Sequence, residues 1–349
     1  MRRFMMWCAC ALYVVATVHA QEALQVQTSG LLDVYAGYNF NNPPATVPGG
    51  NQNVVRAFDQ RSASLELSLL ELNIVKKPEP VGFTVTLTAG KSADLVHYSP
   101  GEDKYKLFQQ AFVSTQIGEW TIDVGKFVTA LGAEVIESAA NDNYSRSLPF
   151  IYAIPFYHTG IRASTTLGAG WGLQAMVVNG WDITEENNGK KSFHAAFSYS
   201  SDQLTFVQNI ITGDEAISPA SGARTVLDTV LFYKLGADKV GLNVDFGEDK
   251  SASAKWVGYA LYYRRALPKD RAVALRYSFF DDKNGFRTGA GVAQKLSEFT
   301  LTYEYPIGAS VSRFEVRLDR SNQPFFLDSG GTASKKEQIT VVYSQVFRF

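Results

Sequence analysis

Apolar and polar side chains alternate with a period of two along most of this chain. In residues 83–89 and 240–246, apolar residues interleave with threonine, glycine, asparagine and aspartate, and residues 32–40, 193–199 and 273–279 follow the same pattern. A period of two places successive side chains on opposite faces of a β-strand. The second face is too polar and glycine-rich to form the inside of a soluble barrel. The pattern therefore predicts strands with an apolar outer face and a polar inner face.

Short connections between these segments alternate with long polar ones. The short connections are residues 77–80, 168–170, 236–238 and 306–308, and the long ones are residues 41–61, 130–156, 212–224 and 320–336. This alternation predicts an all-β fold, a transmembrane antiparallel β-barrel of about 16 strands. The predicted strands are centred near residues 34, 70, 87, 112, 124, 163, 176, 196, 207, 230, 243, 260, 276, 301, 315 and 343.

Two positions interrupt the alternation, and the last strand is expected to close the barrel. The phase changes near Leu69 and Leu70, which predicts a β-bulge in the second strand, and the phase near Lys126 is ambiguous. Because lipid cannot hydrogen-bond to an exposed strand edge, the first and last strands must pair. The last strand ends on Phe349 and resembles the terminal segment that the outer-membrane barrel-assembly machinery recognises.

The first residues predict export. Met1, Arg2 and Arg3 form a basic segment, residues 4–18 are apolar and uncharged, and Ala20 ends a run suited to signal peptidase. The apolar run is short for a membrane helix of roughly 20 residues. We therefore expect a signal peptide over residues 1–20, a single barrel domain over residues 21–349, and a location in the bacterial outer membrane.

Composition narrows the choice of function. The 2 cysteines, Cys8 and Cys10, lie inside the predicted signal peptide, so the barrel has no thiolate for catalysis or metal binding. Without Arg2 and Arg3, acidic residues slightly outnumber basic ones, and nothing indicates nucleic-acid binding. No zinc-ligand spacing appears, and the sequence predicts no cofactor.

An outer-membrane hydrolase is the enzymatic alternative. Such an enzyme needs a histidine beside a serine or a carboxylate. The histidines after residue 20 are His97, which lies in a long loop near Asp94, His158 at a loop-to-strand junction, and His194 on a predicted inner face. No serine neighbourhood makes a triad, so the sequence favours a barrel that is not an enzyme.

Several motifs together point to a family. They are Val124 to Thr129, Gly132 to Ser138, Asn143 to Ser147, Pro155 with His158 to Gly160, Leu275 to Tyr277 with Phe280 to Asp282 and Gly285 to Gly289, and Arg313 to Asp319. As a set they resemble the putative beta-barrel porin-2 (OmpL-like) family over nearly all of the chain after the signal peptide. The resemblance implies a barrel and, less firmly, a porin role.

The connection at residues 130–156 resembles in layout the loop that folds into general porins and narrows the pore. Its carboxylates would then face the interior, opposite arginines on the polar face of late strands, and create a transverse field that sorts solutes. The alternative is that the loop carboxylates are solvated and the strand charges pair with their neighbours. The pore-lining candidates are Glu134, Glu137, Asp142, Arg276, Arg313, Glu315, Arg317 and Asp319.

We expect an outer-membrane porin that allows passive diffusion of small hydrophilic solutes or ions, because sixteen strands leave an aqueous channel. One alternative is a substrate-selective channel, in which Tyr35, Tyr262 and Phe280 form a stacking track or else belong to the interfacial girdle. The other alternative is a structural or adhesive barrel that acts through its loops. The predicted partners are outer-membrane lipid, the assembly machinery and small solutes, whereas solute charge and formation of a homo-oligomer stay open.

Overall fold

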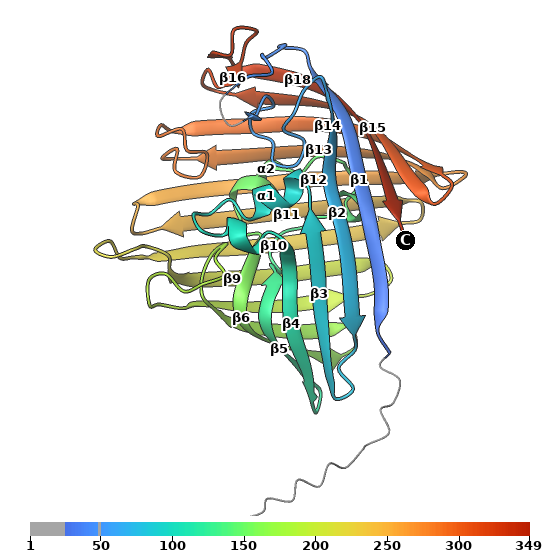
Figure 1. Ribbon diagram of the computed structural model, residues 1–349, viewed down its shortest axis with the longest axis vertical. Coiled ribbons are helices and arrows are strands. Elements are labelled where there is room, and N and C mark those ends of the chain that lie inside the picture. Colours follow the sequence, from blue (N-terminus) through green and yellow to red (C-terminus); the bar gives the residue numbers. More distant parts are fainter. Residues whose placement is uncertain (1–24, 48–49) are drawn as a thin grey trace, which may run out of the picture.

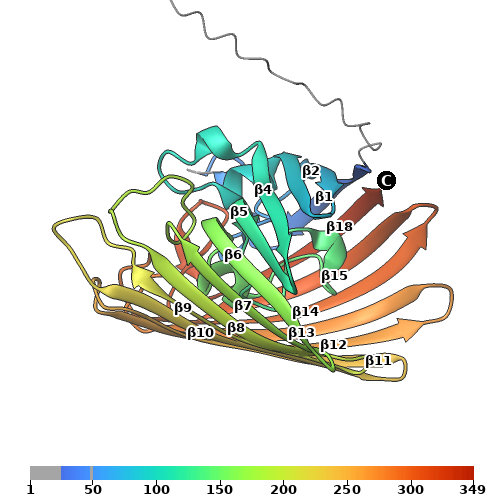
Figure 2. The same ribbon diagram turned by 90° about the horizontal axis from the view of Figure 1, so that it is seen from below.

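A computed structural model describes residues 25–47 and 50–349, so the predicted signal peptide lies outside the described residues. Within these residues, sixteen antiparallel strands close into one barrel, because β1 pairs with both β2 and the last strand, β18. Figures 1 and 2 show the strands as a tilted ring with the long connections gathered at one end. The predicted fold class is confirmed.

The barrel strands are of similar length, between 8 and 14 residues. They are β1 (Gln27–Asn39), β2 (Ser64–Lys76), β3 (Val81–Ala89), β4 (Phe108–Ile117), β5 (Trp120–Val128), β6 (Tyr157–Gly168), β7 (Trp171–Val178), β8 (Ser192–Ser200), β9 (Leu204–Asp214), β10 (Ala223–Leu235), β11 (Asp238–Asp249), β12 (Ala254–Leu267), β13 (Arg271–Asp282), β14 (Gln294–Ile307), β15 (Ser310–Ser321) and β18 (Glu337–Arg348).

The remaining elements are short and lie in the long connections. Helix α1 (Lys91–Val96) precedes β4, helix α2 (Leu148–Tyr152) precedes β6, and β16 (Phe326–Leu327) pairs with β17 (Ala333–Lys335) before β18. Single 3₁₀ turns occupy Asp103–Tyr105 and Ser138–Ala140. Among the helices in the described part of the chain, none has the length and apolar character needed to cross a membrane.

The period of two separates an apolar outer face from an inner face. In β12, Trp256, Ala260 and Tyr262 point inward and are buried, whereas the intervening Leu261 is 48% exposed on the outside. Phe299 on β14 of the same barrel is likewise exposed. This band of exposed apolar side chains is the surface that a hydrocarbon environment requires.

Both predicted interruptions of the pattern have structural causes. Asp33 pairs with Leu69 but Val34 pairs with Leu67, so β2 contains one extra residue, which confirms the predicted bulge. Near Lys126, the preceding Gly125 has a φ of 139°, and both Lys126 and the residue after it are buried.

One predicted connection is shorter than expected. Residues 212–224 were predicted as a loop, but β9 continues to Asp214 and β10 begins at Ala223, and these two residues are register partners. The connection is therefore residues 215–222. Thr212 and Thr225 share a hydrogen bond of 2.8 Å across this extension, so polar residues that suggested a loop extend the strand ladder instead.

Long connections fold into the barrel at the end where they gather. Helix α2 contacts β11, β12, β13 and β14, and Figures 1 and 2 show it within the ring of strands. Phe58 from the first long connection contacts Phe150 and Phe156, with ring centroids 6.1 Å apart in both pairs. The interior therefore contains an apolar cluster, although the strand pattern alone predicted a polar one. Loop side chains supply much of this cluster, and a strand period does not describe them.

Candidate functional site

The connection between β5 and β6, residues 129–156, is the element that divides the interior, and we call it the inserted loop. Its two ends meet where the Thr129 amide donates to the Phe156 carbonyl over 2.9 Å. Gly132 has a φ of 88°, and a Cβ atom there would lie 2.5 Å from Cδ1 of Ile154. Only glycine satisfies both conditions, so the loop turns inward sharply at this point.

Helix α2 holds the second half of the inserted loop against the wall. Ser147 caps the helix by accepting a hydrogen bond from the Phe150 amide at 3.3 Å, and Pro149 lies in the first turn, where its missing N–H costs nothing. The Trp256 indole donates to the Ala153 carbonyl over 3.2 Å. The first contact stabilises the beginning of helix α2, and the second holds the residue that follows its end.

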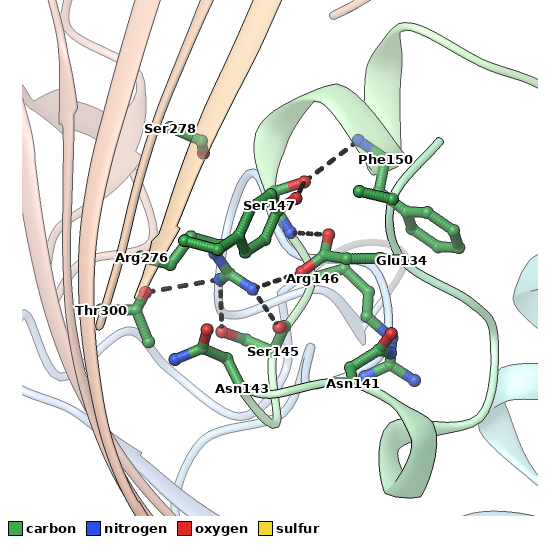
Figure 3. Close-up of polar contacts among 12 residues, drawn as sticks. Glu134, Asn141, Asn143, Ser145, Arg146, Ser147, Phe150, Arg276, Ser278 and Thr300 are labelled. Carbon is green, nitrogen blue, oxygen red and sulfur yellow. Dashed lines mark hydrogen bonds and ion pairs between the residues drawn. The ribbon is translucent and has the colours of Figure 1, made fainter. Parts of the chain in front are cut away.

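Arg276 on β13 connects the wall to the inserted loop (Figure 3). Its guanidinium is fully buried, and it forms ion pairs of 2.7 Å with Glu134 of the loop and with Glu298 on β14. It also donates to the Ser145 carbonyl over 2.5 Å. The other oxygen of Glu134 accepts from the Ser147 amide at 2.7 Å. A buried arginine of this kind needs several acceptors, and the loop provides them.

The two inward-facing arginines of β15, Arg313 and Arg317, bind loop carbonyls as well as carboxylates. Arg317 pairs with Asp319 on its own strand at 2.7 Å and donates to the Arg146 carbonyl over 2.6 Å. Arg313 pairs with Glu304 at 2.6 Å and donates to the Asn141 carbonyl over 2.8 Å. Each arginine thus pairs with a neighbouring carboxylate and also fixes the loop backbone.

The acidic residues of β15 complete the attachment. Glu315 accepts hydrogen bonds from the Tyr144 amide at 2.7 Å and from the Ser145 amide at 3.1 Å. Asp319 also pairs with Arg56 of the first long connection at 3.1 Å. One strand therefore positions segments from two different loops.

The structure does not gather all three loop carboxylates at the arginine wall. Asp142 pairs instead with Lys239 at 2.8 Å and with Arg264 at 3.4 Å. Glu137 lies against the other side of the barrel, where it accepts from Gln109 of β4 at 2.5 Å. Of the predicted loop acids, only Glu134 contacts a predicted arginine.

Burial changes the titration of groups within the inserted loop. Arg146 is buried, and this desolvation lowers the pKa of its guanidinium, which donates to the carbonyls of Val135, Ile136 and Tyr144. Burial likewise raises the pKa of Tyr144, whose hydroxyl donates to Asp33 over 3.1 Å. Tyr144 therefore stays protonated at neutral pH, and the three carbonyls that accept from Arg146 hold its guanidinium in place.

Sequence reasoning missed several members of this network. Glu298 and Glu304 occupy inward positions of β14, and Asp33 on β1 accepts from the Ser138 hydroxyl of the loop at 2.5 Å. The alternation of Glu298 with the outward Phe299 was a usable signal for the two glutamates. Nothing in the sequence indicated that Ser145 and Arg146 would meet the late strands.

The aromatic residues proposed for a stacking track all point inward. Tyr35 accepts from the Arg61 amide at 3.2 Å, Tyr262 lies 3.4 Å from the Ser147 hydroxyl, and Phe280 packs on Tyr152 with ring centroids 5.5 Å apart. All three are buried, so they are not girdle residues. They contact the loops instead of forming an exposed row.

The histidines have partners that do not form a catalytic triad. His97 lies 2.7 Å from the Lys126 ammonium, His158 donates from Nδ1 to the Gly180 carbonyl over 2.9 Å, and His194 lies 3.0 Å from the Asn209 amide oxygen. Across residues 25–47 and 50–349, no group of three or more His, Cys, Asp or Glu residues is placed to hold a metal ion.

A cavity of about 560 Å³ lies at the short-turn end, between the inserted loop and the turn that joins β10 to β11. Five basic and three acidic side chains line it, so positive charge prevails. They are Lys234, Lys239, Arg264, Arg313 and Arg348, and Asp142, Asp238 and Glu304.

Solved structures of outer-membrane proteins share this fold at low sequence identity. An anion-selective porin from Comamonas acidovorans is 14% identical, with 93% of this chain and 99% of that chain covered and a TM-score of 0.61. OmpT of Vibrio cholerae in its trimer form is 10% identical, with 93% and 99% covered and a TM-score of 0.63. The channel DcaP of Acinetobacter baumannii is 12% identical, with 92% and 97% covered and a TM-score of 0.60. These likenesses show a shared fold.

No curated protein matches the sequence. Residues 25–349 match the family described as "Putative beta-barrel porin-2, OmpL-like". The match covers nearly the whole described barrel and agrees with the motifs in the sequence. The chain therefore belongs to the beta-barrel porin-2 (OmpL-like) family and is a porin of the bacterial outer membrane.

Proposed function

We propose that this porin passes small hydrophilic solutes or ions by passive diffusion, and that the inserted loop sets the width and charge of the passage. The observation that carries the proposal is the attachment of that loop inside the barrel by Arg276, Arg313, Arg317 and Glu315. Hydrogen bonds and ion pairs on several strands hold the loop rigidly, and a rigid polar constriction discriminates solutes by size and charge.

The first test is single-channel conductance of the protein in a planar bilayer, with the reversal potential measured under a salt gradient. We expect stable conductance steps. A folded barrel, verified by its heat-modifiable mobility on a gel, that gives no conductance would refute the diffusion proposal. Reversing the charge of Arg317 should change the ion preference, and an unchanged reversal potential would exclude this residue from the selective part of the passage.

A substrate-selective channel is the second candidate, and the basic cavity at the short-turn end favours it. Its volume of about 560 Å³ falls within the usual range of small-molecule sites. In that case flux of a small carboxylate would saturate with concentration and would be competed by a second carboxylate. Flux that stays linear for carboxylates of several sizes would favour general diffusion.

Export, the absence of an enzymatic step and the oligomeric state belong to the same proposal. Residues 1–20 direct export and are cleaved, and no enzymatic step is part of the function. Association into a homo-oligomer is proposed because OmpT, which has the same fold, is described as a trimer. Chemical cross-linking of the protein in outer membranes tests this association, and a single monomer band at all cross-linker concentrations would refute it.

A further inference from the structure

Three basic side chains stand in a row on the inner face of the barrel at the short-turn end. Lys234 on β10 is the register partner of Lys239 on β11, which is in turn the register partner of Arg264 on β12. All three line the cavity of about 560 Å³ beside the inserted loop, and we call them the basic row. Like charges directly opposite on neighbouring strands destabilise a sheet. The basic row therefore favours negative charge inside the cavity.

Two carboxylates of the chain compensate only part of this charge. Asp142 of the inserted loop contacts Lys239 at 2.8 Å and Arg264 at 3.4 Å. Glu304 on β14 is shared by Arg264 at 2.5 Å and by Arg313 on β15 at 2.6 Å. Positive and negative groups thus alternate from β11 to β15, and the series begins and ends with a cation.

Two further cations line the same cavity without a carboxylate partner. Lys234 and Arg348 form no ion pair with any residue in the described ranges 25–47 and 50–349. Arg348 donates instead to the Ala139 carbonyl of the inserted loop. Lys234, the first member of the basic row, therefore faces Lys239 across the ladder with no carboxylate of its own.

The third carboxylate at the cavity belongs to the outer face of the barrel. Asp238 accepts from the Tyr263 hydroxyl at 2.8 Å and pairs with Arg265 at 3.4 Å, and Arg265 is 56% exposed. The inner lining therefore has five basic side chains against the two carboxylates of Asp142 and Glu304, an excess of three positive charges.

Small residues leave room for a ligand beside these cations. They are Ala139, Ala140, Gly236, Ala237 and Ala266. A Cβ atom on Gly236 would meet no other atom within 4 Å. Lysine and arginine bind oxyanions through charge-assisted hydrogen bonds. Because neighbouring strands lie about 4.8 Å apart, the positive charge is spread over several strands, which suits an anion with two separate charged groups.

We propose that the basic row binds a short dicarboxylate at the short-turn mouth of the passage. One carboxylate lies beside Lys234 and Lys239, and the second meets the remaining positive charge of the cavity. A dicarboxylate therefore binds more tightly than a monocarboxylate of the same length. This inference rests on the proposed function, since it names the class of solute that the channel retains at this mouth.

The first experiment is calorimetric titration of the folded protein in detergent with succinate and with butyrate, which has the same number of carbons and one carboxylate fewer. Wild type should bind succinate more tightly. Lys234→Gln should weaken succinate binding about fivefold, the upper range for a solvent-exposed charge pair. Lys77→Gln is the matched control, because Lys77 is an exposed lysine in the turn between β2 and β3 at the same end and does not line the cavity. It should leave both affinities unchanged.

A second variant should act in the opposite direction. Asp142→Asn removes the carboxylate that Lys239 and Arg264 share, so both cations become available to the ligand. Succinate should then bind severalfold more tightly than to wild type. Damage to the loop would weaken binding instead, so tighter binding separates recognition by charge from a structural effect. Weaker binding in Asp142→Asn, with a heat-modifiable fold retained, would refute the proposed site.

The outcomes separate this site from the channel function. Equal affinities for succinate and butyrate, or an unchanged succinate affinity in Lys234→Gln, would refute the site. Inorganic phosphate that binds more tightly than succinate would refute the dicarboxylate and assign an anion with a single centre. Conductance without succinate binding would refute the site and leave passive diffusion in place. Succinate binding with the expected variant effects, but without conductance, would refute passive diffusion and support the site.

Discussion

At the scale of single residues, Arg276 is the side chain on which the position of the inserted loop depends most. Its guanidinium bridges Glu134, Glu298 and the Ser145 carbonyl, so one side chain joins the loop to two strands. Removing one partner of a buried ion pair costs more than the pair contributes, because the remaining charges are left uncompensated. The arrangement therefore makes the position of the loop sensitive to single substitutions.

We predict that Arg276→Leu lowers the free energy of unfolding by about 3–5 kcal/mol, because Glu134 and Glu298 become unpaired buried charges. Denaturant unfolding in detergent micelles measures this change. Arg320→Leu is the control, since Arg320 pairs with Glu337 on the surface, where the two side chains are 59% and 58% exposed. The control should lose about 0–1 kcal/mol, and equal losses in both variants would contradict the prediction.

His97 gives a residue-scale prediction for pH. Burial first, and then the Lys126 ammonium, lower the pKa of His97 to about 4 from the ordinary histidine value of 6.5. The folded protein therefore keeps the imidazole neutral. The stability that it contributes is fully present above pH 6.5 and is lost as the pH falls toward 4, by up to about 3 kcal/mol.

The measurement is the difference in unfolding free energy between wild type and His97→Gln at several pH values in this range. The difference isolates His97 because all other groups titrate in both proteins. Wild type should lose its advantage as the pH falls. A difference that does not change with pH would show that the neutral imidazole is not what the fold requires.

At the scale of elements, the inserted loop combines two kinds of attachment. Phe150 and Phe156 join the apolar cluster at the long-loop end, and Tyr144 and Ser145 bind Glu315 through their amides. The apolar contacts favour burial of the loop, whereas the directional hydrogen bonds fix its register against the strands. This combination explains how a segment of irregular structure remains inside a barrel.

Replacing residues 134–147 with a short glycine–serine linker should increase single-channel conductance severalfold, because the loop fills part of the cross-section. The control replaces residues 216–221, in the connection at the same end that includes the exposed Ile217. That variant should keep the wild-type conductance. Wild-type conductance in the first variant, with a heat-modifiable fold retained, would mean that the inserted loop does not limit the passage.

At the scale of the whole molecule, the barrel closes through its last residue. The amides and carbonyls of Gly30 and Phe349 exchange hydrogen bonds of 2.8 and 3.0 Å. A Cβ atom on Gly30 would lie 2.5 Å from the Phe349 ring, so the ring packs directly over the glycine. The terminal aromatic therefore has a structural role in the seam between β1 and β18.

We expect Phe349→Ser to reduce the amount of assembled barrel severalfold, since both the seam and the predicted signal for the assembly machinery are altered. Quantifying the heat-modifiable form in outer membranes measures this effect. Tyr277→Ser is the control, because Tyr277 is an exposed outward aromatic in the middle of a strand, away from the seam. Equal yields of both variants would contradict a special role for the last residue.

The sequence by itself determined the barrel. Lipid outside and water inside impose opposite chemistry on alternate residues, so strand number, the order of short and long connections and even the bulge at Leu69 can be found by counting along the chain. The prediction erred at residues 212–224, where polar residues at a strand end look the same as a loop.

Only the tertiary structure decided the interior. Arg276 and Glu134 lie 142 positions apart in sequence, and Glu315 binds the Tyr144 amide 171 positions away, so no local pattern could indicate which groups are partners. The period of two along a strand indicates which face a side chain occupies. It does not indicate how far an irregular loop reaches into the space that the strands enclose. The inserted loop is positioned by contacts with many strands at once, and those contacts exist only after the barrel has closed.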